Sequence, residues 1–393
     1  MKILHFCPDD KFMAFVQECF ETVFPGASRF RVRGRRGTGP EYLRAGPDVE
    51  RVGSSYWRSH RVRAEMADAD CLVINFMHPR FAEAVKLAPP RLLVIWVGWG
   101  ADYASLLQPY TGALCLPQTT ELVRRLPGRL LARTGQESSR ISFAIDAGLR
   151  RLKTVCRGPR ASLADVIGRI DYAWVHAEEQ AYLERALPGF SRRYHRMFCF
   201  SAERTFAVGP ERMDGEDILI GNSATPTNNH LELFDELGRL DLGDRRLIAP
   251  LSYGNSRYGD MIARIGVKRF GRRFVPLRSY MPPEEYYGYL RRCGTVIMNH
   301  VRQQAGTTVA TALYKGAKVY LRDENPLLSF YRKMGIRVSS VPDDLHRAGD
   351  TFGPVTEAEM ARTRETLNAH WGHQAALDSV RGLASLVADK RAA

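Results

Sequence analysis

The chain has 393 residues, of which 45% are hydrophobic, and this is enough for two α/β domains of ordinary size. No stretch approaches the ~20 consecutive apolar residues of a transmembrane helix, and the N-terminus turns polar after one strand length, which argues against a signal peptide. Seven scattered cysteines without a CxxC pair argue against a disulfide scaffold or a zinc site, whereas the net charge of +14 points to an anionic partner. We therefore expect a cytoplasmic protein.

The first half of the chain alternates between short apolar runs and longer amphipathic runs, a pattern typical of parallel strands joined by helices. We expect strands at 2–6, 71–76, 92–97, 172–175 and 194–200. Helices are expected at 11–23, 79–87 and 178–187. The Gly- and Arg-rich stretch at 31–56 is expected to be loop with one short strand.

A polar stretch at 201–217 separates this pattern from a second one. In the second half we expect strands at 218–221, 246–251, 273–277, 295–299 and 318–321. The expected helices are 230–240, 259–265, 283–292, 309–315 and, at the end, 356–390. The predicted domains are 1–205, 206–355 and a C-terminal helical segment at 356–393. The fold class is therefore α/β, with two doubly wound, Rossmann-like domains that face a cleft.

The most informative stretch is GTVIMNHVRQQAGTTVATALYKGAKVYLRDENPL, residues 294–327. It predicts a strand, a polar loop that contains Arg302, a helix that Gly316 ends, a second strand and a second polar loop. Such a unit brings a helix N-terminus, free backbone N–H groups and a guanidinium to one edge of a parallel sheet. These groups bind phosphate, so the stretch indicates a nucleotide ligand.

The positive charge is concentrated between Glu121 and Arg160, where ten basic residues stand against three acidic ones. Apolar residues at 141, 145, 149 and 152 recur with helical spacing in this segment. One interpretation is an interfacial helix on an anionic membrane surface. The other is an amphipathic helix that packs on the protein core and has a basic outer face.

Asp68-Ala69-Asp70 has the letters of the DxD metal motif but precedes the strand at 71–76. It is therefore expected at the amino end of the sheet, whereas ligands of parallel sheets bind at the carboxyl end. We expect no metal site and no cofactor.

Several short motifs resemble glycosyltransferase family 56, the family of the TDP-N-acetylfucosamine:lipid II N-acetylfucosaminyltransferases of enterobacterial common antigen synthesis. The resemblance covers most of the second domain and is patchy in the first. The matching residues are Trp99-Gly-Ala-Asp102, Ile220-Gly-Asn-Ser223, Asn229-His230, Pro250, Tyr253-Gly254, 286–293, Arg302-Gln-Gln304, Gly306-Thr307 and Glu324-Asn-Pro326. It implies a GT-B fold and metal-independent transfer of a deoxy-amino sugar from a TDP-sugar donor. The implied acceptor is a polyprenyl-diphosphate glycan at the inner membrane. The stretch 31–56 and the basic segment 121–160 differ from the enteric members of the family. We favour the interfacial interpretation of segment 121–160, because such an acceptor must be reached at the membrane.

The candidate donor-binding residues lie in loops that follow the strands of the second domain. Arg302 is expected to pair with the diphosphate, Gly306 to allow a close backbone approach, and Thr307 and Thr308 to cap the helix or donate to phosphate. Asn222, Ser223 and Thr225 are candidates for phosphate or sugar contacts, although such loops are often plain turns. The remaining candidates are Gln303 and Gln304 in the phosphate loop, Tyr253, Arg278, Tyr280 and Met281 around the base, and Glu324 and Asn325 near the ribose or sugar, or as a helix cap.

An inverting transfer also needs a general base in the first domain. Asp102 is the first candidate because it follows the strand at 92–97 through a glycine-rich turn, and His78 follows the strand at 71–76 in the same way. Both residue types also cap helices. His176, Asp9 and Asp10 follow other strands. A retaining transfer needs no such base, and the sequence leaves the stereochemical outcome open.

Two other functions fit parts of the sequence. A nucleotide-sugar 2-epimerase uses a similar fold, but its soluble substrate does not require the basic apolar segment. A nucleic-acid-binding protein fits the charge, but Phe143 is the only aromatic residue of the basic segment, so stacking platforms for bases are missing. We therefore expect no nucleic-acid partner.

Overall fold

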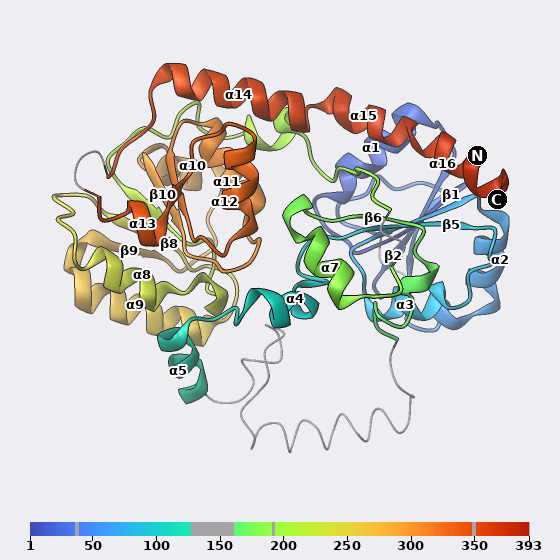
Figure 1. Ribbon diagram of the computed structural model, residues 1–393, viewed down its shortest axis with the longest axis horizontal. Coiled ribbons are helices and arrows are strands. Elements are labelled where there is room, and N and C mark those ends of the chain that lie inside the picture. The colour runs from blue at the N-terminus through green and yellow to red at the C-terminus, as the bar shows by residue number, and fades with distance from the viewer. Residues whose placement is uncertain (36–38, 127–160, 191–192, 348–350, 393) are drawn as a thin grey trace. The chain divides into compact units, whose positions relative to one another are not determined.

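The computed structural model describes residues 1–35, 39–126, 161–190, 193–347 and 351–392. The chain forms two compact units (Figure 1). The first unit comprises Met1–Leu107, Thr154–Ala202 and His370–Ala393, and the second comprises Gln108–Lys153 and Glu203–Ala369. The fold class predicted from the sequence, two α/β domains with parallel sheets, is confirmed.

The first unit is built on a six-stranded sheet with the order β3-β2-β1-β4-β5-β6, in which every neighbouring pair is parallel. The strands are β1 (Ile3–Cys7), β2 (Ser28–Arg33), β3 (Val49–Val52), β4 (Cys71–Asn75), β5 (Leu93–Val97) and β6 (Tyr172–Trp174). The chain order reverses between β1 and β4. This is the switch point of a doubly wound sheet, where the crevice outside the strand ends binds ligands.

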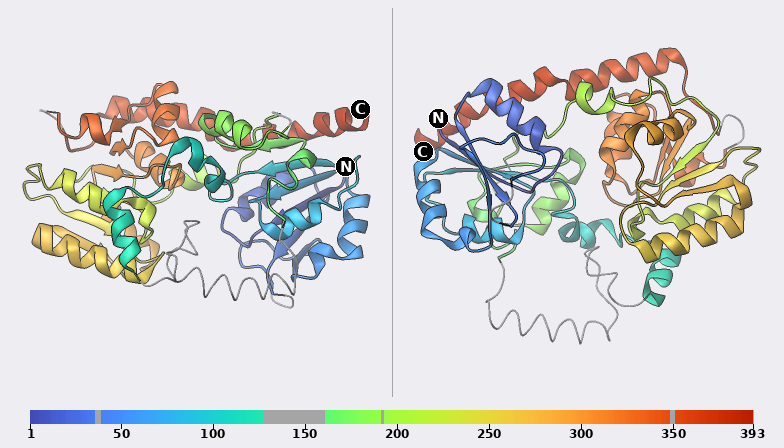
Figure 2. Two further views of the ribbon diagram at one scale, coloured as in Figure 1. Left: turned by 60° about the horizontal axis from the view of Figure 1, so that its bottom comes forward. Right: turned by 180° about the vertical axis from the view of Figure 1, so that it is seen from behind.

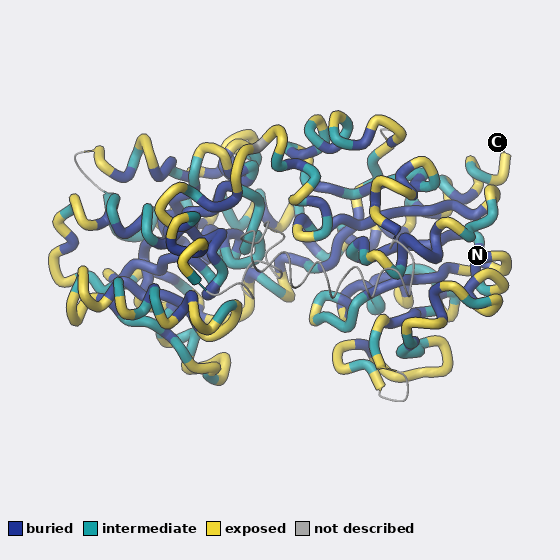
Figure 3. The backbone as a smooth tube through the Cα atoms, turned by 90° about the horizontal axis from the view of Figure 1, so that it is seen from below, coloured by how far each residue is buried: buried dark blue, intermediate teal, exposed yellow. Residues whose placement is uncertain are grey.

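Both faces of this sheet are covered. Alternate residues of β1 point to opposite faces, so Phe6 packs against Trp57 and Phe81 on one side while His5 stacks on Phe30 on the other. The helices of this unit are α1 (Met13–Val23), η1 (Tyr56–Arg58), α2 (His60–Asp68), α3 (Pro79–Val85), η3 (Ile167–Arg169), η4 (Ala177–Glu179), α7 (Gln180–Ala186), α15 (His373–Arg381) and α16 (Leu383–Ala392). The central strands β1, β4 and β5 are buried along their whole length, whereas β2, β3 and β6 include partly buried or exposed residues, and the outer sides of the helices are exposed (Figure 3).

The second unit repeats the same plan with the strand order β12-β11-β10-β7-β8-β9, again entirely parallel. Its strands are β7 (Ile218–Ile220), β8 (Leu247–Pro250), β9 (Phe274–Leu277), β10 (Thr295–Met298), β11 (Lys318–Leu321) and β12 (Ser339–Ser340). Five of these match predicted strands to within a residue at each end. The switch point here lies between β7 and β10.

Helices α8 and α9 lie side by side on one face of this sheet (Figure 2), and Phe234 and Tyr258 of these helices belong to its core. The helices of the unit are α5 (Pro117–Arg125), η6 (Pro226–Asn228), α8 (His230–Leu237), α9 (Ser256–Phe270), η7 (Gly271–Arg273), α10 (Pro283–Arg291), α11 (Gly306–Tyr314), α12 (Pro326–Lys333) and α13 (Val341–Asp344). Three helices each begin in one unit and end in the other: α4 (Ala104–Thr111), η5 (Ala202–Phe206) and α14 (Glu357–Trp371).

Two predicted elements of the first domain are wrong. The stretch at 31–56 contains the one short strand expected there, β3, but it also contains the end of a second strand, β2, whose Phe30 and Val32 are buried against the sheet. The expected strand at 194–200 is reduced to one bridge between Ala173 and Tyr194. A run of aromatic and sulfur-containing residues there is apolar enough for a strand, but it packs as irregular chain beside α15.

The contacts divide the chain between Ala202 and Glu203, close to the expected boundary at 205. They also assign residues 108–126 to the second unit and 370–392 to the first, which differs from the expected domain limits. The six cysteines of the described residues are buried, and no disulfide joins them to one another. In that part of the chain no helix is both long and apolar enough to cross a membrane.

Candidate functional site

The loops that follow β7 and β10 meet at the switch point of the second sheet. Gln304 joins them: its amide nitrogen donates to the Asn222 side-chain oxygen (3.1 Å), and its oxygen accepts from the Thr227 hydroxyl (2.7 Å). The Asn222 amide nitrogen also donates to the Tyr253 hydroxyl (2.8 Å), which brings in the loop after β8. The structure therefore brings three predicted donor residues, Asn222, Gln304 and Tyr253, into one hydrogen-bond network.

Ser223 and Thr225 stabilise the β7 loop from within. The two hydroxyls are hydrogen-bonded at 2.9 Å, and the Asn228 amide nitrogen donates to the Ser223 hydroxyl (3.1 Å). Ser223 is 1% exposed. The side chains of Ser223 and Thr225 therefore fix the conformation of the loop that follows β7.

Helix α11 begins at Gly306, directly after Ala305, which has a left-handed backbone (φ 55°). The expected capping by Thr307 and Thr308 is wrong, because both residues lie in the first turn and no side chain caps the helix. A helix without a cap leaves its first backbone N–H groups to other acceptors. Anions are favoured at such an end by these N–H groups and by the helix dipole.

Arg302 and Gln303 precede this helix N-terminus. The Arg302 guanidinium is half-buried and donates to the Gln303 carbonyl oxygen (2.9 Å). A Cβ on Gly306 would lie 3.2 Å from the Gln303 amide nitrogen, so the glycine permits this close approach. A guanidinium, a glutamine amide and free helix N–H groups thus occupy one strand end.

The residues expected around the base are placed differently from one another. Arg278 holds the β8 loop through its guanidinium, which donates to the carbonyls of Leu251 (2.7 Å) and Ser256 (3.1 Å) and pairs with Asp260. Tyr280 is 85% exposed, and Met281 beside it is partly exposed. Arg278 therefore acts on the loop that carries Tyr253.

The Glu-Asn-Pro motif starts helix α12 as its proline predicts. Asn325 caps the helix by accepting from the Leu327 N–H (3.0 Å), and its amide nitrogen donates to the His300 carbonyl (3.2 Å). Glu324 is held by Arg322 at 2.8 and 3.0 Å, and this ion pair together with the hydrogen bonds outweighs burial and lowers the pKa of Glu324. The carboxylate is thus ionised and partly exposed at the strand end.

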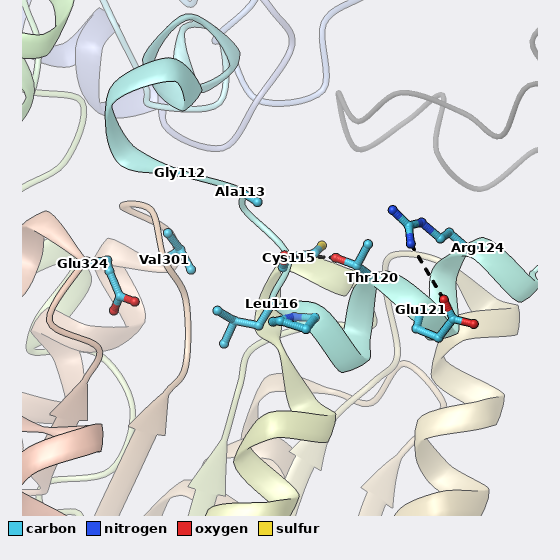
Figure 4. A pocket seen from close by; sticks show the side chains of 10 residues that line it. Gly112, Ala113, Cys115, Leu116, Thr120, Glu121, Arg124, Val301 and Glu324 are labelled. Atoms are coloured by element: carbon cyan, nitrogen blue, oxygen red, sulfur yellow. Dashed lines mark hydrogen bonds and ion pairs between the residues drawn. The ribbon is translucent and has the colours of Figure 1, made fainter.

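A pocket of about 480 Å³ adjoins these loops (Figure 4). Val301 and Glu324 contribute from the loops after β10 and β11, and Leu116 contributes from the segment that passes beside them. The other lining residues are Gly112, Ala113, Cys115, Pro117, Thr120, Glu121 and Arg124. The pocket therefore combines apolar lining residues with the charged side chains of Glu121, Arg124 and Glu324.

The segment at 112–117 is attached to the switch point by Asn229, which sequence reasoning noted only as a motif residue. Its side-chain oxygen accepts from the Leu116 N–H (2.9 Å), and its amide nitrogen donates to the carbonyls of Leu114 (3.2 Å) and Asn299 (3.1 Å). Asn229 is fully buried with φ 50°. Asparagine tolerates a left-handed backbone better than most residues, so the asparagine at position 229 is the feature of the sequence that could have indicated such a turn.

Two buried histidines at the same strand ends were not predicted as site residues, although His230 belongs to the Asn229-His230 motif. His230 contacts the Tyr258 hydroxyl through Nδ1 (3.0 Å), and burial lowers the pKa of His230 to about 3. His300 contacts the Asn228 side-chain oxygen through Nε2 (2.9 Å), and burial lowers the pKa of His300 well below its usual value. Both rings are therefore neutral at physiological pH.

In the first unit, Asp102 lies in the turn after β5. Its carboxylate accepts from the backbone N–H groups of Met77 (2.8 Å) and Trp99 (2.9 Å) and from the Trp96 indole (3.0 Å). Burial outweighs these bonds and raises the pKa of Asp102 to about 6. The residue therefore joins the strand ends of β4 and β5 and ionises near neutral pH.

His78 caps helix α3 by accepting from the Arg80 N–H through Nδ1 (3.1 Å). Asp9, after β1, accepts from the N–H groups of Glu41 and Tyr42 and pairs with Arg51. These two side chains thus stabilise the local chain at the carboxyl edge of the first sheet.

Comparison with known proteins identifies the family. The family described as 4-alpha-L-fucosyltransferase, glycosyl transferase group 56, matches residues 152–349, which is half of the chain. The chain belongs to this family. It is a glycosyltransferase, as the resemblance implied, and neither the epimerase nor the nucleic-acid-binding alternative describes this family.

Solved structures show the fold of this glycosyltransferase. Sucrose-phosphate synthase from Thermosynechococcus elongatus is similar with a TM-score of 0.58 at 10% identity, over 99% of this chain and 100% of that one. The N-terminal domain of trehalose-6-phosphate phosphatase from Candida albicans gives a TM-score of 0.59 at 10% identity, over 99% and 97%. HepE from Anabaena, in complex with UDP and glucose, gives 0.52 at 9% identity, over 100% and 98%. The fold is GT-B, as expected.

The remaining sequence expectations concern metal and membrane. In the glycosyltransferase, Asp70 lies just before β4 and pairs with Arg391, so the Asp68-Ala69-Asp70 motif is at the amino edge of the sheet, as predicted. No group of three or more possible metal ligands occurs among the residues that the structure describes. Of the basic segment 121–160, residues 127–160 lie outside the described residues. In the described part, Arg124 and Arg125 pair with Glu121.

Proposed function

We propose that this group 56 enzyme transfers a deoxy-amino sugar, similar to N-acetylfucosamine, from a TDP-sugar to a glycan carried on a polyprenyl diphosphate. The reaction belongs to the synthesis of a bacterial surface polysaccharide. The enzyme acts in the cytoplasm at the inner membrane face, which the basic segment 121–160 contacts. The donor needs no metal or cofactor for transfer.

The observation that carries the proposal is the arrangement at the switch point of the second sheet. The uncapped N-terminus of α11, the Arg302 guanidinium and the network around Asn222 and Gln304 occur at one strand end. A diphosphate leaving group develops negative charge as the glycosidic bond breaks. Positive and dipolar groups held in place stabilise that charge. The HepE complex with UDP and glucose supports a nucleoside diphosphate as the ligand class.

The acceptor hydroxyl requires a base if the transfer inverts the configuration. We assign this role to Asp102, with His78 as the second choice. A base works best when its pKa lies near the working pH. Burial raises the pKa of Asp102 to about 6, so the carboxylate is ionised at neutral pH and still basic enough to accept a proton.

The test of the donor site is calorimetric titration of the enzyme with TDP and UDP. TDP is expected to bind more tightly than UDP. Arg302→Ala should weaken TDP binding by about 2 kcal/mol, roughly 30-fold, because hydrogen bonds to a charged group are lost. Arg337→Ala is the matched control. Arg337 lies just before β12, at the opposite strand end from the candidate site, and pairs with Glu359. Equal binding to the wild type and to Arg302→Ala would refute the site.

The test of the reaction is a screen of TDP- and UDP-sugars against a polyprenyl-linked acceptor extract, read by mass spectrometry. A mass increase of one N-acetylated deoxyhexose on the lipid-linked glycan is expected. Pelleting with vesicles that contain anionic lipid tests the membrane contact. Recovery of all the enzyme in the supernatant at low salt contradicts that part of the proposal.

A further inference from the structure

The orientation of the Asn228 side chain is fixed by its backbone neighbours. Its amide nitrogen lies 2.9 Å from the Thr225 carbonyl, which can only accept, and its oxygen lies 2.9 Å from the Asn222 N–H, which can only donate. Exchanging the nitrogen and the oxygen would break both bonds. Asn228 is 1% exposed, so water cannot replace them.

This orientation determines the protonation of His300. The Nε2 atom of His300 lies 2.9 Å from the Asn228 oxygen and must therefore carry a hydrogen. The ring is fully buried, and Arg302 adds positive charge nearby, so a second proton is disfavoured. His300 is thus a neutral ring with Nε2 protonated, and its Nδ1 has no partner among the described residues.

The backbone of His300 is held as well. The Asn325 side chain, which caps α12, donates to the His300 carbonyl (3.2 Å). One residue thereby links three strand-end loops: its own after β10, the loop after β7 through Asn228, and the loop after β11 through Asn325. Asn228 in turn orients the Asn222 backbone and the Ser223 hydroxyl.

We infer that His300 is a positioning residue for the donor: its neutral Nε2–H holds the β7 loop against the phosphate loop that contains Arg302. The inference rests on the proposed function, because it takes the switch point to be the diphosphate site. A histidine that only fills the core would tolerate an apolar side chain of similar size. A positioning histidine requires a donor at the place of Nε2.

Glutamine and leucine separate these two roles. The amide nitrogen of glutamine can occupy the place of histidine Nε2, whereas leucine fills similar volume without a donor. Loss of one buried hydrogen bond corresponds to about 10-fold weaker TDP binding in His300→Leu, and His300→Gln should stay within about 3-fold of the wild type. Calorimetry on the full chain measures both, and thermal melting confirms that each variant is folded.

His5→Leu is the matched control. His5 is also fully buried and contacts the Ser28 hydroxyl through Nε2 (3.3 Å), but it belongs to the first unit. It should lower the melting temperature and leave TDP affinity unchanged. Wild-type affinity in His300→Leu overturns the inference, and so does an equal loss in His300→Gln and His300→Leu.

A second measurement uses the wild-type enzyme without ligand, so it does not depend on whether a variant folds. In ¹⁵N-histidine-labelled enzyme, the proton-coupled nitrogen spectrum distinguishes Nε2–H from Nδ1–H rings. The His300 signals should report Nε2–H and stay constant from about pH 5 to pH 8, because burial keeps the pKa of His300 well below its usual value. A titrating ring or an Nδ1–H ring overturns the inference even if TDP binds. Failure of the wild type to bind TDP, with the expected nitrogen spectrum, refutes the proposed function and with it the role toward the donor, but leaves the Nε2–H contact between the two loops standing.

Discussion

Replacement of Asn229 by alanine should destabilise the second unit strongly. The side chain accepts from the Leu116 N–H and donates to the carbonyls of Leu114, Thr227 and Asn299, with distances of 2.9 to 3.3 Å. The amide nitrogen has two hydrogens for these three carbonyls, so the side chain makes about three full hydrogen bonds, each of which contributes ~1 kcal/mol net, and a left-handed backbone costs alanine ~1 kcal/mol more. We therefore expect a loss of about 4 kcal/mol in the free energy of unfolding.

Urea unfolding measured by two probes tests this expectation. All five tryptophans belong to the first unit, so their fluorescence reports that unit, whereas far-UV circular dichroism reports both. Asn229→Ala should shift the dichroism transition to lower urea. Asn229→Gly removes the same hydrogen bonds but tolerates φ 50°, so it should be about 1 kcal/mol more stable than Asn229→Ala. If Asn229→Ala lowers the free energy of unfolding by less than about 1 kcal/mol, Asn229 does not hold the segment at 112–117 as described.

Three further outcomes are expected. If Asp102 is the base, kcat/KM should fall as the pH drops through about 6, because the Asp102 carboxylate, whose pKa is raised to about 6, becomes protonated there; above that pH the value should stay level. Asp102→Asn should retain TDP binding but lose about 100-fold or more in kcat. Full activity of Asp102→Asn would exclude this role. Gly221→Ala should weaken TDP binding and lower the melting temperature, because at φ 65° the added Cβ would lie 2.6 Å from the Asn228 side-chain oxygen. Gly243→Ala is the control: Gly243 also has a positive φ but no such close neighbour, so this variant should lower the melting temperature only slightly and leave TDP binding unchanged. Equal behaviour of the two variants would contradict the close approach at Gly221. Chelation with EDTA should leave the transfer rate unchanged, and loss of activity that a divalent ion restores would contradict metal-independent transfer.

The central strands β7, β8, β10 and β11 of the second unit were predictable because they are short, largely apolar and buried on both sides. The run from Thr295 to Met298 and the run from Lys318 to Leu321 carry this signature, and Gly316 at φ 85° follows the helix between them as predicted. Strand β2 was missed because Arg29, Arg31 and Arg33 alternate with its apolar residues, so its pattern is too polar. Local sequence therefore predicts uniformly apolar strands better than strands that carry charged residues.

The side-chain network of the site was less predictable. Arginine is a residue type that often binds ligands, yet the guanidinium of Arg278 donates hydrogen bonds to the carbonyls of Leu251 and Ser256. His300 and Asn228 are far apart in sequence, and only the parallel register of β7 and β10 brings the two loops together. Sequence spacing identifies the loops at a strand end, but the partner of each polar group depends on the tertiary fold.

The attachment of residues 112–117 to the second sheet limits how this enzyme can be divided. A fragment that starts at Glu203 contains every strand of the second sheet but lacks Leu114 and Leu116. Asn229 would then expose its amide to solvent, and the wall that Leu116 gives to the pocket would be missing. Donor recognition in isolation therefore requires a circularly permuted or co-expressed fragment that restores these residues, and simple truncation at the polar stretch should yield an unstable product.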